Sequence, residues 1–127
     1  MSNVPGEHLI AIVEDDLGMR QGLSWLLAAS RFRVEAFGSA EEFLQRGLGD
    51  EFDCVVLDVR LPGMNGLALR QLMRDRGYRA PTLVVSGHDD EASRDRLRRA
   101  GVTRWLHKPF DGQTFIDAVN DAIGGRS

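Results

Sequence analysis

The sequence has a single cysteine and no long apolar run. One cysteine cannot form an internal disulfide, and Cys54 lies inside an apolar stretch, so it is interpreted as a small buried side chain in a reducing compartment. No stretch reaches the length needed to cross a bilayer, and residues 1–7 lack the basic start and apolar centre of a signal peptide. We therefore expect a cytoplasmic protein with a flexible polar leader at residues 1–7.

The sequence also lacks an excess of positive charge. Its 16 basic and 19 acidic side chains give a formal net charge of −3, which argues against direct binding to nucleic acid or to an anionic membrane. A chain of 127 residues can bury a substantial core but is too short for a receptor joined to an effector. One acidic domain is expected at residues 8–124, followed by a tail at residues 125–127.

Apolar strands alternate with helical segments along the chain. Strands are predicted at residues 9–13, 33–37, 54–58, 81–86 and 103–107. Apolar residues at helical spacing, a capping sequence at Ser39 and a cap at Asp111 predict the helices. The helix that ends near Arg99 has few apolar residues, so we expect it to be mobile, exposed or partly covered by a partner. This alternation implies an α/β fold whose parallel sheet is covered on both faces.

Polar residues stand at or just after the ends of four predicted strands. Asp15 follows the first strand, Asp58 ends the third, Ser86 ends the fourth and Lys108 follows the fifth. Each alone could be a helix cap, a turn residue or a surface charge. Because parallel strands end at the same edge of a sheet, the four residues together predict one site.

These residues suit phosphoryl transfer to a carboxylate. Glu14, Asp15 and Asp58 would repel one another unless a divalent cation neutralised them, and their oxygens favour Mg²⁺, or Mn²⁺, over zinc. Asp58 is the predicted nucleophile, and it needs no general base because a carboxylate is already ionised. Lys108 and the Ser86 hydroxyl would stabilise the oxygens of the transferred phosphoryl group.

Four segments carry a resemblance to a known family. They are IVEDD at 12–16, VVLDVRLPGMNG at 55–66, VSGH at 85–88 and WLHKPF at 105–110. In this order they resemble the receiver domain of two-component response regulators, from about His8 to Ile123. The sequences SGH at 86–88 and FGSAEEF at 37–43 are most similar to receivers of nitrogen-fixation-type regulators, which usually carry a helix-turn-helix output domain.

The resemblance implies a flavodoxin-like fold with five parallel strands in the order 2-1-3-4-5, as the related chemotaxis receiver has. By position, Asp58 corresponds to the phosphoacceptor, Asp15 to the direct metal ligand and Glu14 to its outer-shell companion. The backbone carbonyl of Arg60 would be a further metal ligand. Asp16 lies one place beyond the usual acidic pair and is interpreted as a helix cap or auxiliary acid.

Further residues match positions that regulate such domains. Ser86 and Trp105 would form the switch, although Trp is bulkier than the usual Tyr or Phe and could instead simply pack on the charged fourth helix. Lys108–Pro109 resembles the family's cis peptide. Arg60 and His88 occupy positions that influence how long the phosphate survives, and His88 could equally be an ordinary surface residue.

The resemblance also implies partners. A sensor histidine kinase or a phosphotransfer protein would phosphorylate the domain and thereby alter the surface of its fourth helix, fifth strand and fifth helix, for a homodimer mate or an effector. The domain would catalyse only its own phosphorylation and dephosphorylation. The ending at residues 124–127 suits a receiver cut from a longer transcription regulator.

Three alternatives are open to test. A phosphohydrolase of the haloacid dehalogenase type needs a second Asp two residues after the nucleophile, where this chain has Arg60, and it also needs a cap region and a late acidic motif that this chain lacks. A flavodoxin-like cofactor module needs a phosphate-cradling loop rich in Gly and hydroxyls, and residues 14–16 would repel phosphate instead. A degenerate receiver that only docks would not need the intact acids, Ser86 and Lys108.

Overall fold

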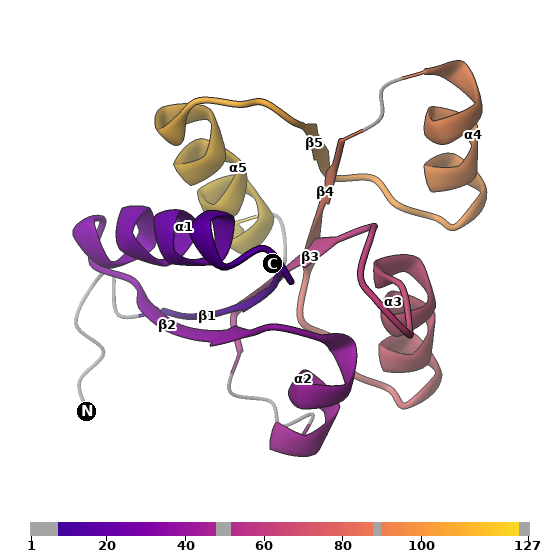
Figure 1. Cartoon of the computed structure of the whole chain (residues 1–127), viewed down its shortest axis with the longest axis horizontal. Helices are drawn as coiled ribbons and strands as arrows, with labels where there is room; N and C mark the ends of the chain where they lie inside the picture. Colours follow the sequence, from indigo (N-terminus) through magenta and orange to yellow (C-terminus); the bar gives the residue numbers. More distant parts are fainter. Residues whose placement is uncertain (1–7, 48–51, 88–89, 125–127) are drawn as a thin grey trace.

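Five strands and five helices alternate in the computed structural model, which describes residues 8–47, 52–87 and 90–124 (Figure 1). The strands are β1 (Leu9–Val13), β2 (Arg33–Phe37), β3 (Cys54–Asp58), β4 (Thr82–Ser86) and β5 (Trp105–His107). The helices are α1 (Leu17–Ala29), α2 (Ala40–Arg46), α3 (Gly66–Asp75), α4 (Glu91–Arg99) and α5 (Gly112–Gly124).

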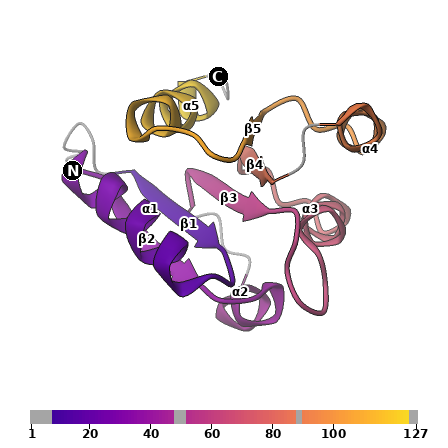
Figure 2. The same ribbon diagram turned by 45° about the horizontal axis from the view of Figure 1, so that its top comes forward.

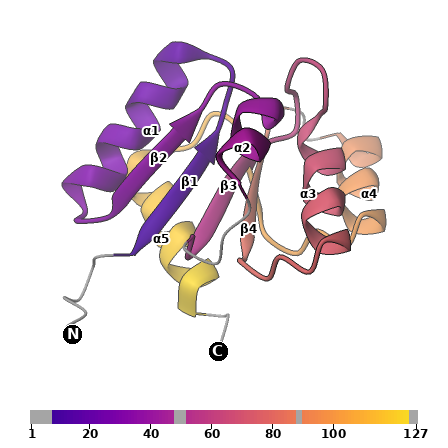
Figure 3. The ribbon, with the colours of Figure 1, turned by 90° about the horizontal axis from the view of Figure 1, so that it is seen from below.

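All neighbouring strands are parallel, and their order is β2-β1-β3-β4-β5. The predicted flavodoxin-like fold and strand order are therefore confirmed. In the view of Figure 3, the chain leaves β1 and β3 at the same edge of the sheet. That edge is where the sequence predicts the site.

Helices cover both faces of the sheet, with α1 and α5 on one side and α2 and α3 on the other (Figures 1 and 2). All residues of β1 and β3 are buried, because side chains on both faces meet a helix layer. Alternate residues of each strand therefore belong to two separate cores. One core includes Phe43 and Leu69, and the other includes Leu27 and Phe115.

Capping side chains fix the starts of the helices. Asp16, Ser39 and Asp111 each accept a hydrogen bond from the backbone N–H three residues later, at 2.8, 3.1 and 2.7 Å. These caps confirm the predictions for all three residues. Asn65 and Asp90, which the sequence reading did not single out, cap α3 and α4 in the same way.

The edge of the sheet beside α4 is lightly packed. Leu97 is the buried residue of α4, and it forms a small apolar cluster with Val84 and Val102, against which Trp105 packs. The expectation that α4 buries little apolar surface is confirmed, whereas its mobility stays a prediction. The fifth strand is shorter than predicted, because it begins at Trp105 rather than at residue 103.

Some expectations lie outside the described residues: the leader at 1–7, the tail at 125–127 and the role of His88. Cys54 is buried, as predicted. Over the described part of the chain, no helix combines the length and apolarity that crossing a membrane requires.

Gly66 begins α3 directly against the backbone of β3. Its N–H donates to the Val59 carbonyl at 3.0 Å, and a Cβ at this position would collide with the carbonyl oxygen of Asp58. The first turn of α3 therefore has to lie against the residue that carries the predicted nucleophile. Only glycine allows this approach without moving the backbone.

Gly66→Ala should lower the free energy of unfolding by about 1–3 kcal/mol, because the added methyl group has to displace backbone rather than a flexible side chain. Gly22→Ala is the matched control. A Cβ at Gly22 in α1 meets nothing within 4 Å, so that change should raise stability by about 0.5–1 kcal/mol through helix propensity. Urea unfolding of both variants measures the difference, and equal effects would contradict the steric account.

Candidate functional site

Three carboxylates meet at the carboxyl edge of the sheet. Glu14 follows β1 and Asp58 ends β3, and the pairing of Val13 with Leu57 makes these two acids neighbours. One oxygen from each of Glu14, Asp15 and Asp58 lies within 4.8 Å of the others. Asp58 and Glu14 are buried, with 5% and 3% of their surfaces exposed, while Asp15 is exposed. The structure thus brings the predicted acids together.

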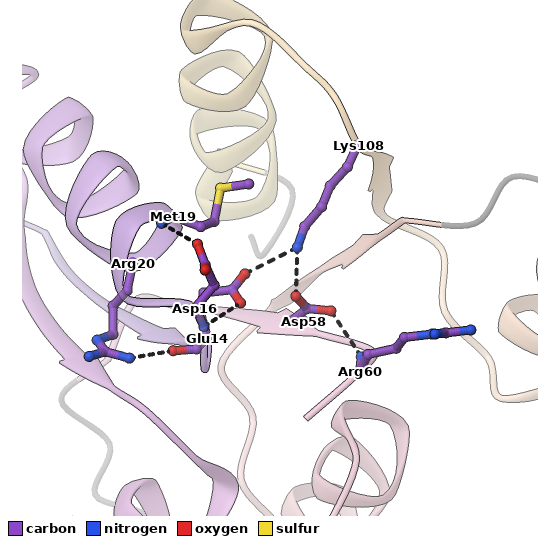
Figure 4. A network of polar contacts seen from close by, with 7 residues as sticks. All are labelled: Glu14, Asp16, Met19, Arg20, Asp58, Arg60 and Lys108. Carbon is purple, nitrogen blue, oxygen red and sulfur yellow. Dashed lines mark hydrogen bonds and ion pairs between the residues drawn. The ribbon is translucent and has the colours of Figure 1, made fainter. Parts of the chain in front are cut away.

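Lys108 reaches the same point from the other side. It follows β5 with a cis peptide bond to Pro109, and its backbone N–H donates to the Ser86 carbonyl at 2.8 Å. Its ammonium group lies 2.7 Å from Asp58 Oδ2 and 3.3 Å from Glu14 Oε1 (Figure 4). The cation therefore bridges two of the three acids.

The other oxygen of Asp58 has its own partner. The backbone N–H of Arg60 donates to Asp58 Oδ1 at 2.9 Å, so the carboxylate orientation is fixed at both oxygens. The Arg60 side chain extends away from the carboxylates in Figure 4. The backbone N–H of Arg60 is the group that holds the carboxylate.

Burial and neighbouring charges shift the pKa values of both Glu14 and Lys108. Burial is the main cause that raises the pKa of Glu14 to about 7 from 4.5, and the nearby Asp58 carboxylate adds to it. Burial would lower the pKa of Lys108, but its hydrogen bonds and attraction to Asp58 and Glu14 outweigh this and raise it. Lys108 is therefore charged at neutral pH, while Glu14 exchanges its proton near neutrality.

Neighbours of Glu14 hold its backbone and side chain. The Asp16 N–H donates to Glu14 Oε2 at 3.1 Å, and Arg20 Nη1 donates to the Glu14 carbonyl oxygen at 2.8 Å (Figure 4). Sequence reasoning missed Arg20, because a single Arg one turn into a helix carries no signal of such a contact. Asp16 caps α1, which confirms the helix-capping interpretation.

The proposed switch residues lie on neighbouring strands. Ser86 is buried at the end of β4, while Trp105 is half-buried at the start of β5. Trp105 packs with Leu97 of α4 in the small cluster described above, so the packing alternative holds for this state. A cavity of about 40 Å³ lies beside Ser86 and Leu97. Rotation of Trp105 remains a prediction.

The sequence comparison assigns the family. Residues 10–120 match the response regulator receiver domain. Because this match covers most of the chain, the protein belongs to the family of two-component response regulator receiver domains, and the resemblance seen in the sequence is confirmed. Members of this family are signalling regulators.

Several relatives are bacterial regulators. The chain is 39% identical to nodulation protein W of Bradyrhizobium diazoefficiens, over 87% of this chain and 49% of that protein. It is 34% identical to the transcriptional regulatory protein FixJ of Azorhizobium caulinodans, over 95% and 57% respectively. The chain therefore spans about half the length of the regulators that it matches.

Solved structures of response regulators have the same fold as this chain. The response regulator StyR aligns with a TM-score of 0.83 and 32% identity, over 94% of this chain and 61% of that one. The receiver domain of the Francisella response regulator 1452 aligns with a TM-score of 0.87 over 95% of this chain and all of that one. At 19% identity, the second likeness supports the fold alone.

The pKa of Glu14 predicts a stability change with pH. Because folding raises this pKa from 4.5 to about 7, the folded state holds the proton more tightly, and the stabilising effect of protonation is lost as the pH rises through about 7. In EDTA, the stability of the wild-type chain relative to Glu14→Gln should therefore fall between pH 4.5 and 7. Urea unfolding across this range measures the difference, and a constant difference would contradict the shifted pKa.

Proposed function

We propose that Asp58 accepts a phosphoryl group, with Mg²⁺ or alternatively Mn²⁺, from a sensor histidine kinase or a phosphotransfer protein. The contact of 2.7 Å between Lys108 Nζ and Asp58 Oδ2, beside a cluster of three carboxylates, carries the proposal. A buried carboxylate held beside both a cation and further acids is arranged for a reaction in which negative charge is delivered to it.

The acids fit a divalent cation. Their three oxygens lie close enough together to share one ion, and an oxygen-only donor set is the one that Mg²⁺ prefers. We propose Asp15 and Asp58 as direct ligands, Glu14 as their companion and the Arg60 carbonyl as a further ligand. When bound, the cation would offset the repulsion among the acids and act as a Lewis acid for the phosphoryl oxygens.

The chain's own groups would perform the transfer as follows. A carboxylate oxygen of Asp58 forms a bond to phosphorus while the bond from phosphorus to the donor's histidine nitrogen breaks, and the electron pair stays on that nitrogen. The Arg60 N–H holds the carboxylate in place throughout. Lys108 then neutralises an oxygen of the new phosphoryl group, and the Ser86 hydroxyl donates a hydrogen bond to another. The product is an aspartyl phosphate on the domain itself, and its later hydrolysis would restore Asp58.

Arg60 and His88 remain proposed modulators of how long that phosphate survives. The exposed Arg60 side chain is directed away from the carboxylates, so it would have to turn to shield the acyl phosphate. His88 is proposed by its place in the sequence alone.

Phosphorylation would alter the face formed by α4, β5 and α5. Movement of Ser86 toward the phosphate would open space for Trp105, whose half-buried ring now packs beside Leu97. The present cavity of about 40 Å³ holds little more than one water molecule, so an inward Trp105 would also require α4 to shift. Because α4 buries little apolar surface, that shift would cost little free energy. The altered face would then bind a second copy of the chain or an effector.

We also propose a role for this domain within a longer protein. The relatives are named as transcriptional regulators and extend well beyond the matched part, so we propose that this domain controls an output domain of a longer cytoplasmic regulator. Residues 8–124 would form the receiver, which would not itself bind nucleic acid. The near balance of its charges agrees with that division.

A groove beside the site offers the phosphodonor protein a docking surface. Apolar parts of α1 and of the segment after Lys108 line a cavity of about 380 Å³; among its residues are Met19, Gly22, Leu26 and Phe110. A donor whose histidine reaches Asp58 has to lie against this edge of the sheet. On α1, Leu17 and Trp25 also expose large apolar side chains, with 56% and 77% of their surfaces accessible.

Incubation with Mg²⁺ and acetyl phosphate should add one phosphoryl group to the wild-type chain and none to Asp58→Asn. Intact mass spectrometry measures the adduct. EDTA should abolish it, because the acids then keep their repulsion and the phosphoryl oxygens lack their Lewis acid.

Asp15→Asn and Asp16→Asn form the matched pair of controls. The first should raise the Mg²⁺ concentration needed for half-maximal labelling by roughly tenfold or more. The second should leave it nearly unchanged, because Asn also caps helices well. Absence of an adduct on the wild type would favour a docking-only receiver, whereas continuous release of phosphate from added esters would favour a hydrolase.

Gly22→Glu should slow phosphorylation by the partner kinase by about tenfold or more, because it places a charge in the apolar groove where the donor would pack. Labelling by acetyl phosphate should be unchanged, since Gly22 faces open space. Gly124→Glu, at the end of α5 and equally open, is the control and should be phosphorylated normally. Equal kinase rates for all three proteins would place the docking surface elsewhere.

A further inference from the structure

A third cavity lies at the amino-terminal end of the strands, opposite the end that carries Asp58. It has a volume of about 340 Å³ and is formed by the end of α3, the start of β4 and the residues before β5. Thr82, which lines it, pairs with Val55, three residues before Asp58. At the usual rise of a strand, the cavity lies about 10 Å from the level of Asp58. In Figure 3, the α3–β4 and α4–β5 connections lie at this end of the strands.

Of the residues that the structure describes, four arginines and no acidic residue line this cavity. They are Arg70, Arg74, Arg79 and Arg104, which come from three separate segments of the chain. Among the described residues, the structure gives the side chains of the last three neither an ion pair nor a hydrogen bond. These arginines converge on one hollow, which gives it a local excess of positive charge.

Arg70 is the buried arginine of the cavity, and its guanidinium is fixed by hydrogen bonds. Only 9% of its surface is exposed, and its guanidinium donates to Thr82 Oγ1 at 3.2 Å, to the Ala100 carbonyl at 2.7 Å and to the Gly101 carbonyl at 3.0 Å. All three acceptors are neutral, so within the described part of the chain no carboxylate pairs with this buried positive charge. This is an unusual arrangement, because buried charges are normally paired.

Nearby charge adds to this imbalance. Burial lowers the pKa of Arg70 below its ordinary value, and the positive charge of Arg74 lowers it further. A Cβ on Gly101 would lie 3.6 Å from Arg74 Nη1 and 3.9 Å from Arg70 Nη1, so the two guanidiniums approach the same turn. An anion in the cavity would relieve the repulsion between them.

We propose that this cavity binds a small organic molecule that carries two or more phosphoryl groups. Its volume falls within the range of small-molecule sites, which begins at about 300 Å³. Planar guanidiniums bind phosphoryl oxygens in pairs, and a phosphoryl group brings about two negative charges where a carboxylate brings one. The Thr103 hydroxyl adds a donor, while the half-buried Ala80 and Pro81 offer apolar surface to the organic part.

Binding there would reach the α4–β5 connection. Arg70 holds the carbonyls of Ala100 and Gly101, which end α4 and lead toward Trp105. A ligand that contacts Arg70 would therefore change how firmly Arg70 holds the segment that leads to β5. The site itself does not depend on phosphorylation of Asp58.

An NMR titration of the ¹⁵N-labelled chain, in EDTA and at constant ionic strength, tests the proposal. Pyrophosphate and ADP are the phosphoryl probes, and citrate is the carboxylate probe. Pyrophosphate should shift the amides of residues 70–82 and 101–104, with ADP binding at least as tightly and citrate at least about tenfold more weakly. Shifts centred on Asp58 and Lys108, or binding of citrate as tight as that of pyrophosphate, would overturn the proposal, as would exclusion of ADP.

Charge variants complete the test. The double change Arg74→Gln and Arg104→Gln should weaken pyrophosphate binding by at least about tenfold, and the exposed single change Arg79→Gln should weaken it by about threefold or more. The matched control is Arg33→Gln with Arg76→Gln, which removes two exposed charges that do not line the cavity. Equal weakening by the control pair would mean that binding follows net charge alone, and the proposed site would be wrong.

Discussion

The ion pair between Lys108 and Asp58 is the interaction on which the rest of the site depends. Three carboxylates gathered at one edge of a sheet repel one another, and two of them are buried where water cannot screen them. A single ammonium that reaches two of these acids makes the cluster tolerable in the folded state. Burial, together with the neighbouring Asp58 carboxylate, raises the pKa of Glu14 to about 7. A divalent cation bound among these acids would relieve their repulsion further.

The backbone of the fold holds the three carboxylates together at the carboxyl ends of the strands. Parallel strands end together, and caps such as Asp16 and Asn65 begin the helices directly beyond those ends. Gly66 lets α3 begin against the backbone of Asp58 itself. The sheet thus has a fully buried centre at β1 and β3 and a lightly packed edge at β5 beside α4. The three acids lie at the end of the buried centre, and Trp105 lies at the lightly packed edge.

The two ends of the sheet also differ in charge. Acids gather at the carboxyl end, whereas guanidiniums gather around the cavity at the other end. A near-neutral composition conceals this separation, because the opposite charges cancel in the sum. Arg70 links the basic end to the turn after α4, in the segment that leads to β5.

The sequence by itself determined the order of the elements, the strand that ends at Asp58 and the membership of Glu14, Asp15 and Lys108 in one site. These follow from local patterns: continuous apolar runs, capping residues and the rule that parallel strands end at one edge. Only the tertiary structure decided which groups share a charge, such as the contact of Lys108 with Glu14 as well as Asp58. It also decided the support from Arg20, the packing of Trp105 and the burial of Arg70 among neutral acceptors. The physical reason is that burial and pairing depend on distances between residues far apart in the chain, and a local pattern carries no record of those distances.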